Sequence, residues 1–294
     1  MRVGDEGSSD GGALVSKRMS LWSAPDMAAA LERHNLRWYG DRGSGELSHT
    51  LMCVRVEDGA RVVVKFDDDH SRLAEQVLVL RRWHEMGFAP EVAAFEPGLC
   101  VLERVAAVPL HWAVGSGVAL VEMVAHVLSE SWDVRDVSVS SAPFWWVFDV
   151  CAGRLRDFSG RRPDLPSGLF DPELFDRARC LLFELRQGQV TGLCHGDPVP
   201  GNVLGDGRGR VWLIDPLAHY DSLLCNVVHW ASRVDGGLNS SLIAVRACAE
   251  IGVVFDRLEL EGWLAFHAIS PLVARVVRGE NVPLELLRLL APLL

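Results

Sequence analysis

The order of strand-like and helix-like segments constrains the fold of this chain more than any other feature of its sequence. Alternating, β-branched runs at 50–56 and 61–66 predict a hairpin in the first third. Beyond about residue 105 the pattern is mostly helical, and two short strands are expected at 191–194 and 211–214. This order predicts an α+β fold with two lobes, a β-rich N-terminal lobe and a mostly helical C-terminal lobe.

Composition changes and punctuation residues divide the chain into three parts. Residues 1–20 are rich in Gly and Ser without an apolar run, which predicts a disordered leader. We expect the N-terminal lobe at 21–104, with helices near 25–35 and 70–87, because both stretches have apolar residues at helical spacing. The remaining residues, 105–294, are expected to form the C-terminal lobe.

Charge limits the classes of partner. The formal net charge of -10 argues against a nucleic-acid partner, because binding a phosphate backbone requires a basic surface. The same charge suits a cationic small substrate, although a solvated acidic surface explains it equally well. No sequence feature indicates an obligate protein partner.

Cysteine usage bears on the redox environment. The seven cysteines are odd in number and form no C-x-x-C pair, so neither a disulfide framework nor a zinc site is expected. The chain has no signal-peptide pattern and no uninterrupted apolar stretch long enough to cross a membrane. We therefore expect a cytoplasmic protein without a membrane partner.

One segment of the chain has the spacing of a kinase catalytic loop. Residues 194–204 read CHGDPVPGNVL and residues 210–216 read RVWLIDP. His-x-Asp followed by four residues and Asn202 matches that loop, and Asp215 ends an apolar run thirteen residues later. Asp197 is the candidate catalytic carboxylate, which would orient an acceptor hydroxyl and take its proton. Asn202 and Asp215 are candidate ligands of Mg²⁺, a hard ion that prefers oxygen.

Each piece of this pattern also occurs without any function. A lone His-Gly-Asp is often a turn, Gly201-Asn202 is a common turn pair, and Ile-Asp-Pro often ends a strand in an Asx turn. Their joint occurrence at these spacings, after a β-rich and before an α-rich region, favours phosphoryl transfer.

These motifs are similar to those of the aminoglycoside phosphotransferase family, whose members have a bilobal, protein-kinase-like fold. The resemblance covers roughly 36–290 and is strongest at 194–230, where HGDPVPGNVL is followed by LIDP. The Ile-Asp-Pro ending resembles the streptomycin/hydroxyurea-type branch, and a branch acting on tuberactinomycin-type peptides is a second possibility. The resemblance implies transfer of the γ-phosphate of ATP or GTP to a hydroxyl of a small molecule, with Mg²⁺.

The resemblance also implies a nucleotide-binding lysine. Lys65, in the apolar run Val62–Phe66, looks like the lysine that holds the α- and β-phosphates, with Glu75 on the next helix as its ion-pair partner. A lysine on an edge strand that reaches solvent, and an ordinary exposed helix acid, are the alternatives. Glu85 is the second choice for the partner.

A glycine cluster resembles the loop that covers the phosphates. Gly43, Ser44 and Gly45, with Ser48 behind them, are the candidate contacts. The match is loose because no G-x-G-x-x-G occurs and Glu46 is unusual beside a triphosphate. A simple hairpin loop is the alternative.

Three further roles follow from the resemblance. The backbone groups of Glu103 and Val105 correspond to the hinge that pairs with a purine, and backbone recognition does not separate ATP from GTP. His195 is interpreted as structural, with its ring bonded to nearby backbone. Asp221 resembles an aspartate that caps a helix and braces the catalytic loop.

Three classes of function remain open. The first is an antibiotic kinase acting on a cationic aminoglycoside or basic peptide and conferring resistance, with Asp149, Glu250, Asp256 and Glu261 as conceivable substrate contacts. The second is a metabolic kinase for choline, ethanolamine, a sugar or an amino alcohol. The third is a non-catalytic nucleotide-binding module. A protein kinase is disfavoured because no Phe-Gly pair follows Asp215.

Overall fold

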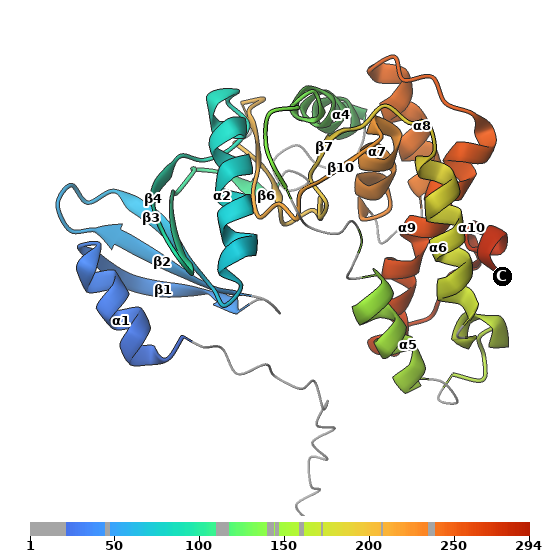
Figure 1. Cartoon of the computed structure of the whole chain (residues 1–294), viewed down its shortest axis with the longest axis horizontal. Helices are drawn as coiled ribbons and strands as arrows, with labels where there is room; N and C mark the ends of the chain where they lie inside the picture. Colours follow the sequence, from blue (N-terminus) through green and yellow to red (C-terminus); the bar gives the residue numbers. More distant parts are fainter. Residues whose placement is uncertain are drawn as a thin grey trace, which may run out of the picture.

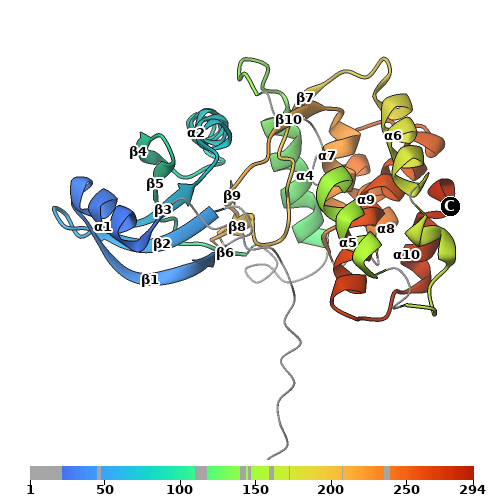
Figure 2. The same ribbon diagram turned by 60° about the horizontal axis from the view of Figure 1, so that its bottom comes forward.

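The computed structural model describes residues 22–44, 48–109, 118–139, 144, 147–158, 162–171, 173–206, 208–234 and 239–294. The predicted leader, 1–20, lies outside these residues. Figures 1 and 2 show two lobes: one contains a twisted sheet flanked by helices, and the other is a group of helices. The predicted bilobal α+β fold is confirmed.

The N-terminal lobe is built on a five-stranded antiparallel sheet with the strand order β1-β2-β3-β5-β4. Its elements are α1 (Ala24–Arg33), β1 (Leu36–Ser44), β2 (Ser48–Arg55), β3 (Arg61–Asp67), α2 (His70–Glu85), β4 (Val92–Glu96) and β5 (Leu99–Glu103). Capping starts both helices, because Ser23 accepts from the N–H of Asp26 and Asp69 from that of Arg72. β5 is the last strand of this sheet along the chain, so the link to the helical lobe begins at Arg104.

The side chains of strand β3 alternate between the two faces of the sheet. Val62, Val64 and Phe66 are buried in a cluster with residues of α1. Lys65 alternates with them and lies opposite Cys100 of β5, so it belongs to the other face, the one covered by α2. The alternation that predicted a strand therefore also determines that Lys65 points away from α1.

Helix α2 packs against both lobes. Leu73 and Val77 contact the N-terminal sheet, whereas Val79, Leu80 and Trp83 belong to the main core of the C-terminal lobe. The indole N–H of Trp83 donates to the Ser131 carbonyl at 3.3 Å. This helix thus connects the Lys65 face of the sheet to the helical lobe.

The glycine cluster is more regular than its composition suggested. The sequence predicted a loop that covers phosphates or a simple hairpin loop at Gly43–Gly45, but strand β1 continues to Ser44. Its register with β2 shifts between Trp38 and Gly40 and again between Asp41 and Gly43. Irregularities of this kind let a glycine-rich strand bend without leaving the sheet.

Helices dominate the C-terminal lobe around one large apolar core. Its helical elements are α4 (Val118–Trp132), η1 (Val147–Cys151), α5 (Ala152–Phe158), η2 (Ser167–Phe170), α6 (Glu173–Arg186), α7 (Leu223–Ala231), α8 (Ser240–Glu250), α9 (Arg257–Val277), α10 (Leu284–Leu289) and η4 (Ala291–Leu293). Helix α9 alone among the described helices has the length and hydropathy of a membrane span, but 72% of its apolar window is buried. It is a core helix that contacts α5, α6, α7 and α10.

Two small sheets lie where the lobes meet. One pairs β7 (Gly192–Cys194) with β10 (His219–Asp221), and the other has the order β6-β8-β9, from β6 (Val108–Pro109), β8 (Val203–Gly205) and β9 (Val211–Leu213). Sequence analysis predicted the strands that became β7 and β9 and missed the other three. β6, β8 and β10 form because neighbouring segments pair with them, which a local sequence pattern does not show.

Candidate active site

His195 fixes the first part of the catalytic loop. Its Nε2 lies 3.0 Å from the Ile214 carbonyl, and its Nδ1 lies 3.3 Å from the backbone N of Asp197. A carbonyl only accepts and an N–H only donates, so the ring is the neutral tautomer with the proton on Nε2. Burial lowers the pKa of His195 to about 4, which agrees with a neutral ring. These contacts fit the structural role expected from the sequence.

Only glycine fits at position 196 of the loop. Its φ is +77°, and a Cβ at this position would lie 1.8 Å from the carbonyl oxygen of Leu217. The same two segments are joined by the Leu217 N–H, which donates to the His195 carbonyl at 2.9 Å. No side chain fits between them, so the loop passes directly over the backbone that leads into β10.

Asn202 brings the two ends of the loop together. Its Nδ2 donates to the carbonyl of Asp197 at 3.0 Å and to Oδ2 of Asp197 at 3.2 Å. Its own carbonyl accepts from the N–H of Ile214 at 3.0 Å. The Asn202 amide thereby orients the Asp197 carboxylate and lies beside the residue that precedes Asp215.

Asp215 and Lys65 join the lobes at this site. Asp215 follows β9 with φ of +54°, a left-handed backbone conformation that Asp tolerates better than most residues. Lys65 forms an ion pair with Oδ1 of Asp215, and its Nζ also donates to Oε1 of Gln76 at 2.7 Å. The Lys65 side chain is 12% exposed and that of Asp215 is 46% exposed. The pair therefore bridges the sheet and the catalytic region at an open edge.

The two aspartates experience opposite electrostatic environments. Burial raises the pKa of Asp197 to about 6, while Arg233 acts against this rise and the charge of Asp215 adds to it. Burial also acts to raise the pKa of Asp215, but the Lys65 charge and hydrogen bond outweigh it and leave that pKa below its ordinary value. Asp215 is thus held ionised, whereas Asp197 is closer to exchanging a proton near neutral pH.

The donor set at Asn202 and Asp215 is suitable for Mg²⁺. Both side chains offer oxygen, and the hydrogen bond from Ile214 to Asn202 fixes the backbone between them. The ionised Asp215 carboxylate supplies the negative charge that a divalent ion needs.

The remaining predicted nucleotide contacts that the structure describes lie in the N-terminal sheet and in the link that follows it. Gly43 and Ser44 end β1, Ser48 starts β2 opposite Asp67, and Gly45 lies outside the described residues. Glu103 is the last residue of β5, and Val105 follows it in the link between the lobes. Their roles stay predictions.

The acids suggested as substrate contacts have local partners. Oε1 of Glu250 lies 3.2 Å from His126 Nε2, Asp256 caps α9 by accepting from the Leu258 N–H, and Glu261 pairs with Arg257 at 2.8 Å. The side chain of Asp149 lies outside the described residues. None of these contacts points to a substrate subsite.

Sequence analysis missed two residues of the site. Gln76, next to the predicted Glu75, accepts a hydrogen bond from Lys65 Nζ at 2.7 Å. It lies on the buried face of α2 with Leu73 and Val77, which pack against the N-terminal sheet. Arg233 follows α7, and no local motif links it to Asp197.

The two lobes, with the loop after β7 and Lys65 on β3 between them, form a bilobal, protein-kinase-like fold. The sequence matches no family model and no curated protein. Solved structures match over most of the chain, including a streptomycin–ATP complex of APH(2'')-IIa, with TM-score 0.57, 13% identity, and coverage of 94% of this chain and 97% of that one.

Two other structures have the same fold. A GDP complex of an aminoglycoside 2'-phosphotransferase-IIIa mutant has TM-score 0.58 and 14% identity, and covers 91% of this chain and 94% of its own. The choline kinase LicA from Streptococcus pneumoniae has TM-score 0.55 and 13% identity, with coverage of 91% and 98%. Antibiotic kinases and choline kinases are thus similar to this chain to the same degree, which establishes the fold and leaves the substrate open.

Proposed function

We propose that this protein is a small-molecule O-phosphotransferase that uses ATP or GTP and Mg²⁺. The observation that carries the proposal is the meeting of Lys65, Asp197, Asn202 and Asp215 at one edge between the lobes. We place the N-terminal lobe at 21–104 and the C-terminal lobe at 105–294, so that the nucleotide lies against the sheet and the acceptor against the helices.

Asp197 acts on the acceptor. Its carboxylate accepts the hydroxyl proton as the acceptor oxygen forms a bond to the γ-phosphorus, and the bond from that phosphorus to the β–γ bridging oxygen breaks. The pKa of about 6 suits this task, because the group is mostly ionised at neutral pH and still takes up a proton readily. The proton then passes to solvent.

Lys65, Asn202 and Asp215 act on the nucleotide. Lys65 binds the α- and β-phosphates, and Gln76 holds its ammonium toward them. Asn202 and Asp215 hold Mg²⁺, which neutralises charge on the phosphates when it is bound. The backbone of Glu103 and Val105 pairs with the purine.

The acceptor we favour is a hydroxyl of a cationic antibiotic, either an aminoglycoside or a basic peptide. The streptomycin complex among the similar structures and the net charge of -10 support this choice. The second candidate is a choline- or ethanolamine-type metabolic substrate, favoured by the similarity to a choline/ethanolamine kinase family protein from Mesorhizobium loti and to LicA.

A coupled nucleotide-turnover assay tests the proposal. The purified chain is given ATP or GTP, Mg²⁺ and a panel of aminoglycosides, basic peptide antibiotics, choline, ethanolamine and sugars. We expect acceptor-dependent turnover that is lost in Asp197→Asn, with mass spectrometry showing one added phosphate on the acceptor. Nucleotide binding without acceptor-dependent turnover across the panel would instead support the nucleotide-binding module.

A further inference from the structure

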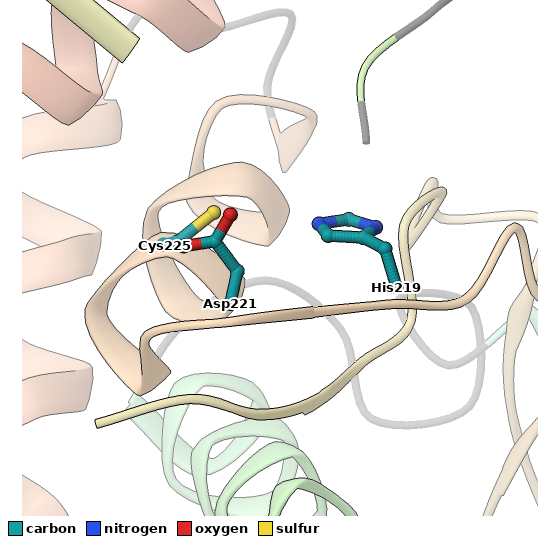
Figure 3. Close-up of side chains that lie close together, drawn as sticks. All are labelled: His219, Asp221 and Cys225. Carbon is teal, nitrogen blue, oxygen red and sulfur yellow. The ribbon is translucent and has the colours of Figure 1, made fainter. Parts of the chain in front are cut away.

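A second group of chemically reactive side chains lies behind the catalytic loop. His219 and Asp221 are two residues apart on β10, so their side chains lie on the same face of the strand. Cys225 comes from the first turn of α7, which Ser222 starts by accepting from the Cys225 N–H at 3.1 Å. All three are buried, and their ligand atoms lie within 4.8 Å of one another. Figure 3 shows them converging from the strand and the helix.

One atom of this cluster is buried without a hydrogen bond to any described residue. It is Nε2 of His219, whose residue is 3% exposed. Oδ2 of the fully buried Asp221 lies 3.1 Å from Nε of Arg186, so it already has one charged neighbour. Figure 3 shows the far edge of the His219 ring directed at the Asp221 carboxylate and the Cys225 sulfur. Buried polar atoms nearly always have a partner, so the unpartnered Nε2, directed at a carboxylate and a thiol, indicates a bound species between the three side chains.

The surrounding contacts prepare the three side chains as ligands. Nδ1 of His219 lies 3.4 Å from the Leu217 carbonyl, so it carries the proton and leaves a lone pair on Nε2. Oδ1 of Asp221 accepts from the Ser222 N–H at 2.8 Å, which orients the carboxylate.

We propose that His219 Nε2, Asp221 Oδ2 and Cys225 Sγ form a binding site for a divalent transition metal, and that Zn²⁺ is the ion it suits. One imidazole, one carboxylate and one thiolate are the donors that Zn²⁺ accepts, whereas Mg²⁺ takes oxygen only. Zinc bonds of about 2.0–2.3 Å need the three atoms to approach slightly. Absence of a C-x-x-C pair does not exclude this site, because its ligands come from a strand and a helix.

The charges of the site balance on metal binding. The Cys225 thiol loses its proton to solvent as the sulfur–metal bond forms, and Asp221 contributes a second negative charge. Arg186 Nε lies 3.1 Å from Oδ2 of Asp221 and stays as a neighbouring cation. The Sγ of Cys225 lies 3.6 Å from His267 Nε2, a further contact that orients the sulfur.

The metal would have a structural effect on the catalytic loop. A Cβ at Gly196 would lie 3.1 Å from Nδ1 of His219, so the loop packs directly on this ligand. β10 also pairs with β7, which leads into the loop, with His219 opposite Cys194. An ion bound by β10 and α7 would stabilise the strand on which the loop packs, without taking part in phosphoryl transfer.

The test is a Co²⁺ titration of the full-length chain, stripped of metal by a chelator and free of nucleotide. Co²⁺ replaces Zn²⁺ and reports thiolate ligation through a near-ultraviolet charge-transfer band. We expect one Co²⁺ per chain, loss of the band when Zn²⁺ is added, and a higher melting temperature with either ion. Cys225→Ser should remove the band, and His219→Gln should weaken Co²⁺ binding by at least about tenfold, as loss of a ligand does.

Three controls isolate the site. Cys194→Ser changes another buried cysteine close by, and Cys180→Ser changes the exposed one; both should keep the band. Asp215→Asn should also keep it, which separates this site from the proposed magnesium site. If Cys225→Ser does not fold, His219→Gln decides. No saturable Co²⁺ binding, or an undiminished band in a folded Cys225→Ser or His219→Gln variant, would overturn the proposal.

Discussion

The candidate catalytic loop and the segment after β9 each contribute one aspartate to the candidate site. The two aspartates lie in different electrostatic environments. The loop encloses Asp197 with Asn202 and the charge of Arg233, and its pKa rises to about 6. The strand end leaves Asp215 half exposed and pairs it with Lys65 from the other lobe, and its pKa falls. The pKa values of two carboxylates in the same candidate site are therefore shifted in opposite directions.

The opposite pKa shifts of Asp197 and Asp215 suit a division of roles within the proposed active site. A pair of acids whose environments separate their pKa values provides one proton acceptor and one permanent charge. The raised pKa of Asp197 suits the proton transfer that we propose for it, and the lowered pKa of Asp215 suits the proposed cation binding. The following variants are chosen to test that division.

The largest expected effect is on the fold of the loop that holds Asp197. Gly196→Ala places a methyl group 1.8 Å from the Leu217 carbonyl oxygen and at positive φ, so we expect a loss of at least about 3 kcal/mol in the free energy of unfolding. Gly201→Ala, in the same loop, meets no atom within 4 Å and is the matched control. Denaturant unfolding measures both. Equal stability of the two variants would show that the loop is not sterically locked.

Asp215→Asn should have the next largest effect. It removes the charge that we assign to Mg²⁺, which supplies several kcal/mol of stabilisation to the phosphates, so kcat/KM for nucleotide should fall on the order of 10³-fold. Raising the Mg²⁺ concentration should restore part of the loss. A variant with normal nucleotide KM at every Mg²⁺ concentration would contradict the assignment.

Lys65→Ala should weaken nucleotide binding by about 10–100-fold, the range for losing a hydrogen bond to a charged group. Arg33→Ala, an exposed cation at the end of α1 on the opposite face of the sheet, should change the nucleotide KM little. The two KM values, measured at saturating acceptor, give the comparison. Lys65→Ala with an unchanged nucleotide KM would remove Lys65 from the site.

The smallest effect concerns the partner of Lys65 on α2. Gln76→Leu removes the hydrogen bond to Lys65 seen here and should raise the nucleotide KM about fivefold, as for a bond worth ~1 kcal/mol. Glu75→Gln should raise it similarly, because we expect Glu75 to pair with Lys65 once nucleotide is bound. An effect in Gln76→Leu alone would assign the partner to Gln76.

How far the sequence predicted this site depended on how local each feature is. Asp197, Asn202 and Asp215 lie in one loop-and-strand segment, so their spacing alone indicated that they would meet. Arg233 approaches Asp197 only through the packing of α7, which no local pattern reveals.

The fold shows the same division. The alternation in β3 and the helical period of α2 were readable, whereas β6, β8 and β10 exist because neighbouring segments pair with them. The extension of β1 through its glycines likewise depends on pairing with β2. The cluster of His219, Asp221 and Cys225 is local in sequence by contrast, because β10 runs through Ser222 directly into α7.

The most direct test of the central claim is the steady-state kinetics of Asp197→Asn at saturating Mg²⁺ with the best acceptor. Asn preserves the size of the side chain and its hydrogen bonding but cannot take up the hydroxyl proton. We predict a kcat lower by about 10²–10⁴-fold, with the nucleotide KM and the melting temperature unchanged. A kcat close to that of the unaltered protein would contradict the assignment of proton transfer to Asp197.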